Sequence, residues 1–144
     1  MQFTTALLGL LAAASSTMAV PVAGTSAMAA VPQWTIKSFT RTCNAADTSC
    51  TVTFGVDTHL TPVTNCKYTV KGSPASRTST NGITCGVYTI SSGWSGQFGE
   101  GNGFTTWAFV DNTNHLITWP AYSDKELVNG QAVVPDKSYS PANL

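Results

Sequence analysis

The sequence feature that most constrains this fold is an alternation of apolar and polar residues with a period of two. In its clearest instance, Val52, Phe54 and Val56 alternate with polar or small residues across 51–57. Successive side chains of a β-strand point to opposite faces, so the pattern predicts a strand with one buried and one exposed face. The other segments interpreted as strands on this ground are 34–39, 67–71, 85–91, 104–111, 114–119 and the shorter 131–134. Within 34–39 the alternation puts Phe39 on the opposite face from Trp34.

Residues that favour turns separate these segments. Some of them accept positive φ or begin a tight hairpin, and the turns are expected at Asn81-Gly82, Asn102-Gly103, Asn129-Gly130 and 111–114. The polar segment 72–82 is typical of an exposed loop. A single helical candidate, 123–128, begins with a serine at its N-cap and is one or two turns long. We therefore predict an all-β fold, a compact antiparallel sandwich or barrel of about seven to eight short strands with at most one short helix.

The N-terminus has the features of a secretory signal. The apolar run 6–14 is too short to span a bilayer as a helix and has the length of a signal-peptide core. Small residues favour cleavage before Val20, and a second site is available before Ala30. We therefore expect a signal peptide at 1–19, a short leader or propeptide at 20–32 and a single β domain at 33–144. The protein is expected to be secreted, with no membrane span.

All four cysteines follow the expected signal peptide: Cys43, Cys50, Cys66 and Cys85. An even number in an exported domain predicts two disulfides. The sequence permits three pairings, of which we prefer the nearest-neighbour one, Cys43–Cys50 and Cys66–Cys85. The polar stretch between Cys43 and Cys50 is typical of a loop between two strands. Each closed loop would add about 2–3 kcal/mol of stability if the bridge acts by restricting the unfolded chain.

The charge and motif content excludes several classes of function. Seven basic and seven acidic residues balance each other, which argues against nucleic acid as a partner. No Gly-x-Ser-x-Gly motif is present, and Asp57 with His59 supplies two metal ligands where a site needs three or four. The glycine-rich stretch 93–103 is followed by a strand, so it predicts a bulge or wide turn and not a phosphate loop. We expect no enzymatic activity, no metal site and no cofactor.

Aromatic residues are the remaining candidates for binding: Trp94, Trp107, Trp119 and Tyr122. If Trp107 and Trp119 both face outward from the last strand pair, they form a flat platform for a carbohydrate or an apolar partner. Trp94 would instead be held at the glycine-rich loop. The alternative is that the tryptophans fill the core.

A family resemblance rests on particular segments of the chain: 34–43, 86–99, 103–106 and 119–127. The run Ser-Gly-Trp-Ser-Gly-Gln-Phe-Gly at 92–99 is distinctive among them. With these segments the chain resembles a group of small secreted proteins of filamentous ascomycete fungi, some of them described as hypersensitive-response-inducing elicitors. It has a looser likeness, in size and two-disulfide β design, to the Alternaria-allergen-like β-barrel proteins.

The resemblance implies a compact β fold, recognition at the plant surface and induction of defence or cell death, with no catalytic residues. We therefore interpret the chain as a secreted, non-catalytic fungal effector or elicitor, acting as a monomer or weak dimer. Its partner would be a plant cell-surface receptor or a wall component. The alternative hypothesis is a cell-wall carbohydrate-binding module that uses exposed aromatic residues, chiefly Trp107, Trp119 and Tyr122.

Overall fold

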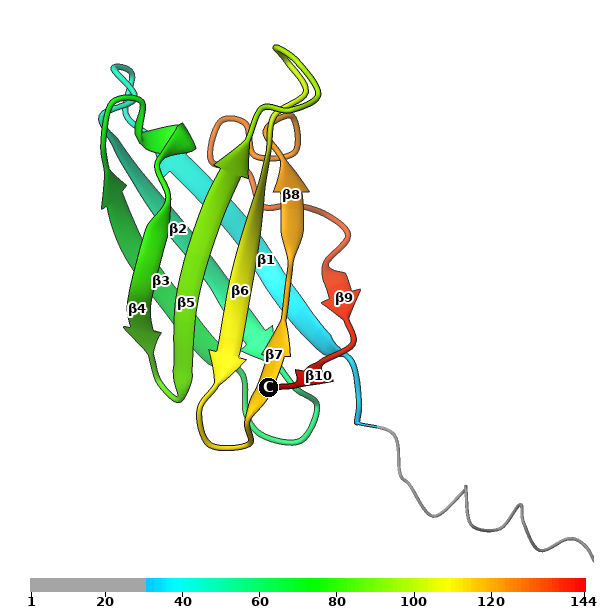
Figure 1. Ribbon diagram of the computed structural model, residues 1–144. Coiled ribbons are helices and arrows are strands. Elements are labelled where there is room, and N and C mark those ends of the chain that lie inside the picture. Colours follow the sequence, from blue (N-terminus) through cyan, green and yellow to red (C-terminus); the bar gives the residue numbers. More distant parts are fainter. Residues whose placement is uncertain (1–30) are drawn as a thin grey trace, which may run out of the picture. The chain divides into compact units, whose positions relative to one another are not determined.

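The computed structural model describes residues 31–144, so the expected signal peptide and most of the leader lie outside the described residues. Two antiparallel sheets face each other (Figure 1). The first has the order β3-β2-β1-β9, made of β1 (Trp34–Cys43), β2 (Ser49–Asp57), β3 (Thr64–Lys71) and β9 (Lys137–Tyr139). The second has the order β10-β7-β6-β5-β4, and β8 (Ala121–Ser123) also pairs with β6. Its other strands are β4 (Thr80–Cys85), β5 (Tyr88–Ser95), β6 (Phe104–Asp111), β7 (Leu116–Thr118) and β10 (Ala142–Asn143). The predicted all-β class and sandwich arrangement are confirmed.

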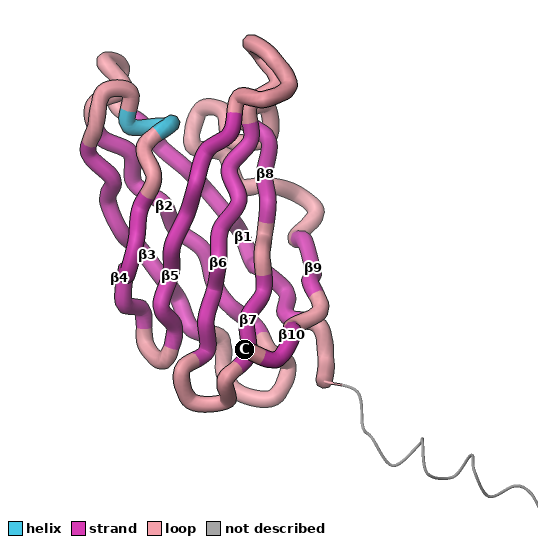
Figure 2. Tube along the Cα trace, in the orientation of Figure 1, coloured by secondary structure: helices cyan, strands magenta, loops and turns pink. Residues whose placement is uncertain are grey.

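Strands account for almost all of the regular structure, as Figure 2 shows. The exception in the described chain is a single turn of 3₁₀ helix, η1 (Ala75–Arg77), between β3 and β4. No helix in residues 31–144 combines the length and apolar character that crossing a membrane would require.

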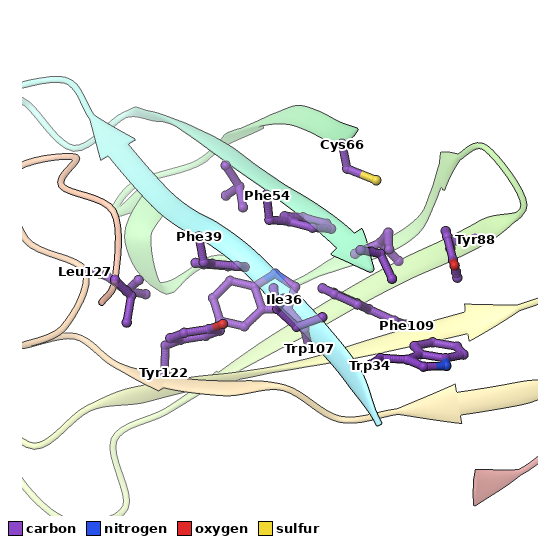
Figure 3. Packing of buried hydrophobic residues seen from close by; sticks show 14 residues of the cluster. Trp34, Ile36, Phe39, Phe54, Cys66, Tyr88, Trp107, Phe109, Tyr122 and Leu127 are labelled. Carbon is purple, nitrogen blue, oxygen red and sulfur yellow. The ribbon is translucent and has the colours of Figure 1, made fainter. Parts of the chain in front are cut away.

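The core lies between the two sheets and is rich in aromatic rings (Figure 3). Phe39 is at its centre, stacked on Phe54 and Tyr122 with ring centroids 5.5 and 4.2 Å apart. Trp107 meets Phe39 edge-on at 4.7 Å. Offset-stacked and edge-on pairs are the favoured aromatic geometries, and they contribute beyond the area that they bury. Rings from both sheets therefore hold the sandwich together.

A bulge in β1 places Phe39 in this core, against the simple alternation of the sequence. The register between β1 and β2 shifts between Lys37 and Thr40, and Ser38 has a φ of 51°. One extra residue on a strand reverses the face to which the following side chains point. Phe39 and Arg41 consequently face inward, and the prediction that Phe39 lies opposite Trp34 is wrong.

Both disulfides form with the preferred pairing. Cys43 and Cys50 bridge the β1–β2 hairpin, where they are also paired in register. Cys66 on β3 and Cys85 on β4 join an edge strand of one sheet to an edge strand of the other. The second bridge therefore links the two layers, while the first reinforces a hairpin that is already hydrogen-bonded.

The segment around Asn81-Gly82 differs from its prediction as a turn. These residues lie inside β4, at a register shift between Thr80 and Ile83, with Gly82 at a φ of 69°. The turn falls instead at Gly86, which has a φ of 57° and connects β4 to β5. A glycine with positive φ fits a bulge as well as a turn, and the pairing of β4 with β5 decides between them.

The predicted helix at 123–128 is wrong, although Ser123 and Glu126 form the reciprocal bonds of a capping box. The Ser123 N–H donates to Glu126 Oε2 at 2.8 Å, and the Glu126 N–H donates to Ser123 Oγ at 3.3 Å. Lys137 lies 2.8 Å from the same carboxylate. Burial alone would raise the pKa of Glu126, but the bonds from Lys137 and Ser123 outweigh it and lower that pKa. Asn129 and Gly130 take positive φ, as predicted for the end of this segment, but the residues before them form turns and no helix.

The expected strand at 131–134 is also absent. Val133 is buried and its N–H donates to the Phe39 carbonyl at 2.9 Å, but Val134 is exposed. Pro135 has no N–H to continue a ladder. The chain pairs with β1 only later, through β9.

Candidate functional site at the glycine-rich loop

Several loops meet at the upper end of the sandwich in Figure 1: the β1–β2 loop, the η1 segment, the β5–β6 loop and the turn after β8. The β5–β6 loop carries the glycine-rich stretch. Side chains from different loops are connected at this end, as the bonds of Arg77 to Glu100 and of Trp94 to Asp124 show. The strand ends therefore bring distant parts of the sequence into one surface.

Trp94 is the centre of this surface. Its indole lies against two glycines, where an added β-carbon would be 2.5 Å from Cη2 at Gly96 and 2.7 Å from Cζ2 at Gly103. The absence of side chains at these positions lets the ring lie directly on the backbone of the loop. The indole Nε1 donates to Asp124 Oδ2 at 2.8 Å. The Arg77 guanidinium lies 4.6 Å from the centre of the ring, in cation–π contact.

Asp124 connects Trp94 to the interior. Its other oxygen, Oδ1, accepts a bond from Arg41 Nη2 at 3.0 Å. The Arg41 side chain is 9% exposed and that of Asp124 is 30% exposed. Arg41 also donates from Nη1 to the Ser76 carbonyl at 3.1 Å. A buried cation on β1 thus holds the carboxylate that orients the indole, so Trp94 is positioned from both sheets.

The outer part of the site is open to solvent. Arg77 and Glu100 approach to 3.4 Å, with side chains 42% and 86% exposed, so this ion pair contributes little to stability. Phe98 at the tip of the loop is 65% exposed and packs on Phe104 with centroids 5.7 Å apart. A cleft of about 240 Å³ opens between Arg77, Trp94, Glu100 and Asp124. Its volume is below the roughly 300–1,000 Å³ of small-molecule sites, so it suits a protruding side chain or one sugar unit.

The candidate binding residues of the sequence are separated by the fold. Trp107 is buried on β6 and donates its indole N–H to the Tyr68 hydroxyl at 2.7 Å, and Tyr122 is buried against Phe39. Trp119 is 53% exposed and lies between β7 and β8. Because Trp107 points inward, residues 31–144 do not form the expected Trp107–Trp119 platform. A binding role for Trp94 and Trp119 stays a prediction.

Sequence reasoning missed Arg41, Arg77 and Asp124 as parts of the site. Arg41 alternates with Thr40 and Thr42 in the sequence, and only the β1 bulge turns it inward, so its burial has no local signal. Asp124 falls in the first turn of the helix predicted at 123–128, which does not form. Nothing in the local sequence connects Arg77 to Trp94, which are joined only through tertiary structure.

Neither of the possible metal-ligand groups has the character of a metal site. Asp47 lies with Cys43 and Cys50 within ligand distance, but both cysteines are in a disulfide and supply no thiolate. Asp57 accepts the His59 N–H at 2.9 Å at the end of β2, and this pair has the geometry of a local turn.

Comparison with known proteins identifies the family. The family model described as Effector TSP1 matches residues 35–144, which include both disulfides and the whole loop-end site. Over 146 residues, the chain is 55% identical to the Effector TSP1 of Hypocrea virens (strain Gv29-8 / FGSC 10586). That alignment covers 100% of this chain and 99% of the relative. These matches agree with the expected fungal effector, and the chain belongs to the Effector TSP1 family.

Proposed function

We propose that this effector is secreted and acts outside the fungal cell, where a plant cell-surface receptor or wall component recognises it. Recognition then induces defence responses or cell death. The family supplies the effector role. The two disulfides fit an oxidising, extracellular compartment. The observation that carries the proposal is the Trp94 site, a surface of aromatic and charged side chains held in place from the core.

The composition of this surface suits a protein partner. Tryptophan and arginine are enriched among the residues that dominate binding energy, and here Arg77 stacks over Trp94. Phe98 adds an exposed ring at the loop tip. The network through Asp124 fixes Trp94 before any partner binds, which lowers the entropy lost on association.

The two carboxylates of the cleft each face a cation. Asp124 is bonded by Arg41 and Trp94, and Glu100 faces Arg77. Both oxygens of Asp124 are occupied by these bonds, which leaves Glu100 as a single carboxyl group in the cleft, where carboxylate-based hydrolysis uses a pair. We propose on this ground that the effector does not act by catalysis. The carbohydrate-binding alternative is not proposed, because two of its three aromatic residues, Trp107 and Tyr122, lie in the core.

The proposal is tested by infiltrating purified mature protein into leaves and measuring cell death, oxidative burst and defence-gene expression. Phe98→Ala and Arg77→Ala should weaken the response, since both remove exposed contacts and leave the Asp124 network in place. Leu60→Ala is the control, an exposed apolar residue in the β2–β3 connection, and Trp119→Ala tests the exposed aromatic residue outside the loop end. A wild-type protein without any response would refute the proposed function. A response lost in Trp119→Ala but kept in Phe98→Ala and Arg77→Ala would place the recognition surface elsewhere.

A further inference from the structure

The balanced net charge of this chain hides an uneven distribution of basic side chains. Three of them pair with acids in the fold: Arg41 with Asp124, Arg77 with Glu100 and Lys137 with Glu126. The lysines without an ion pair among residues 31–144 are Lys37, Lys67, Lys71 and Lys125. All of these except Lys125 lie on the outer face of the β1–β2–β3 sheet, so that face carries three lysines without an ion pair in the described chain.

The alternation of the strands establishes this placement. Lys67 and Lys71 are exposed on β3, whose inward positions include the buried Cys66 and Val70. Lys37 is exposed on β1. It is paired in register with Gly55 of β2, and Gly55 is paired in turn with Asn65 of β3. With strands about 4.8 Å apart and a rise of about 3.3 Å per residue, Lys67 is about 12 Å from Lys37 and about 13 Å from Lys71. The three charges form a triangle across the sheet.

A groove of about 490 Å³ runs between Lys37 and Lys67. Its walls offer hydrogen-bonding groups from Ser38, Thr53 and Asn65, and an apolar contact from the exposed Val63. At Gly55, which also lines the groove, an added β-carbon would be 2.8 Å from Val63 Cγ1, so the Val63 side chain packs directly over the glycine. Hydroxyl and amide groups beside lysines suit a hydroxylated anion.

Two acids border the groove and limit the path of a ligand. Asp136 accepts the Ser38 N–H at 2.8 Å on the β1 side. Asp57 lies at the end of β2 and is engaged by the His59 N–H. An anionic chain would therefore cross from Lys37 toward Lys67 and Lys71 over β2 and β3, away from both carboxylates.

We propose that this face binds an acidic polysaccharide, a uronate chain whose carboxylates meet Lys37, Lys67 and Lys71. Charge complementarity selects an anion, and the groove combines an apolar lining for the face of a sugar ring with hydroxyl and amide groups that can bond its substituents. Nucleic acid is disfavoured, because the outward positions of β1, β2 and β3 carry no aromatic ring for base stacking and no arginine for bidentate phosphate contacts. This surface is separate from the Trp94 site and would retain the effector in an acidic wall matrix.

Isothermal titration of the mature protein with polygalacturonate tests the proposal, with methyl-esterified polygalacturonan as the neutral probe. Each contact between a lysine and the polymer releases counterions, so the affinity depends on the salt concentration. With three contacts and the salt dependence of a flexible polyanion, the affinity should fall about 20-fold between roughly 50 and 200 mM salt. Lys37→Gln combined with Lys67→Gln should reduce that fall to about threefold, because one contact remains. Lys125→Gln, which removes the unpaired lysine off this face, should behave as wild type.

Equal binding of the charged and the esterified polymer would overturn the proposal. So would a loss of affinity in Lys125→Gln as large as in the double variant, since the site would then not be on this face. Binding to single-stranded DNA or to vesicles containing phosphatidylserine as tight as to polygalacturonate would refute the sugar-specific assignment. The titration involves no plant response, so it can fail while the proposed function holds, and the reverse is equally possible.

Discussion

Replacement of Asp124 with alanine should destabilise the protein by about 3 kcal/mol. The substitution removes the acceptor of both the Arg41 guanidinium and the Trp94 indole. Arg41 would keep one bond, to the Ser76 carbonyl, and its Nε already has no partner in the described residues. A largely buried cation would thus lose its counter-charge.

The magnitude follows from the burial of the pair. Loss of one partner of a buried ion pair costs about 3–5 kcal/mol. The lower end applies because Asp124 is 30% exposed and water can enter beside Arg41. With an unfolding entropy of about 2.1 cal/mol/K per residue, a loss of 3 kcal/mol over the described chain corresponds to a fall in Tm of about 12 °C.

Urea and thermal melts followed by circular dichroism would measure this for Asp124→Ala, Arg41→Met and the double variant. Arg41→Met combined with Asp124→Ala should recover much of the stability lost in Asp124→Ala, because no unpaired charge remains buried. If Asp124→Ala costs less than about 1 kcal/mol, the pair behaves as an exposed one and the reasoning is refuted. Strictly additive effects in the double variant would refute it as well.

Three further perturbations test other parts of the fold. Gly103→Ala should cost about 2 kcal/mol in urea melts, since its β-carbon would overlap the carboxylate and indole described above. Gly93→Ala meets nothing nearer than 3.9 Å and should stay within about 0.5 kcal/mol of wild type; similar losses for the two would contradict the packing. Replacing Cys66 and Cys85 together by alanine should cost about 3 kcal/mol, for a loop with a sequence separation of 19, and unchanged melting would argue against this role. The pKa of Glu126 is lower in the folded state, so its contribution is present above its unfolded pKa of about 4.3 and is lost as the pH falls through the folded value. The Tm of Glu126→Gln should therefore decline less than that of wild type between about pH 6 and pH 2, and parallel declines would contradict it.

Much of the β architecture was predictable because local patterning decides it. Val52, Phe54 and Val56 alternate without interruption, and all three are buried in β2. The Cys43–Cys50 bridge was also predictable, because a hairpin brings near neighbours together. The predictions from sequence were wrong where one local pattern is compatible with two structures. A glycine with positive φ makes a turn or a bulge, and the serine and glutamate of 123–126 cap a single turn that does not extend.

The sequence alone was enough for the strand-rich class, the two disulfides and the position of Trp94 at the start of a glycine-rich stretch. Which aromatic residues are buried and which charges have no ion pair depends on contacts between distant strands and loops. The bulge at Ser38 reverses the direction of Phe39 and Arg41, and such a shift depends on the register with a neighbouring strand. Asp124 pairs with Arg41, which is 83 residues away in the chain. Acids that pair elsewhere in this way do not balance the lysines of the outer sheet, which have no ion pair of their own among the described residues. Ion pairing depends on distance in space, so a balanced composition could not reveal a cationic face.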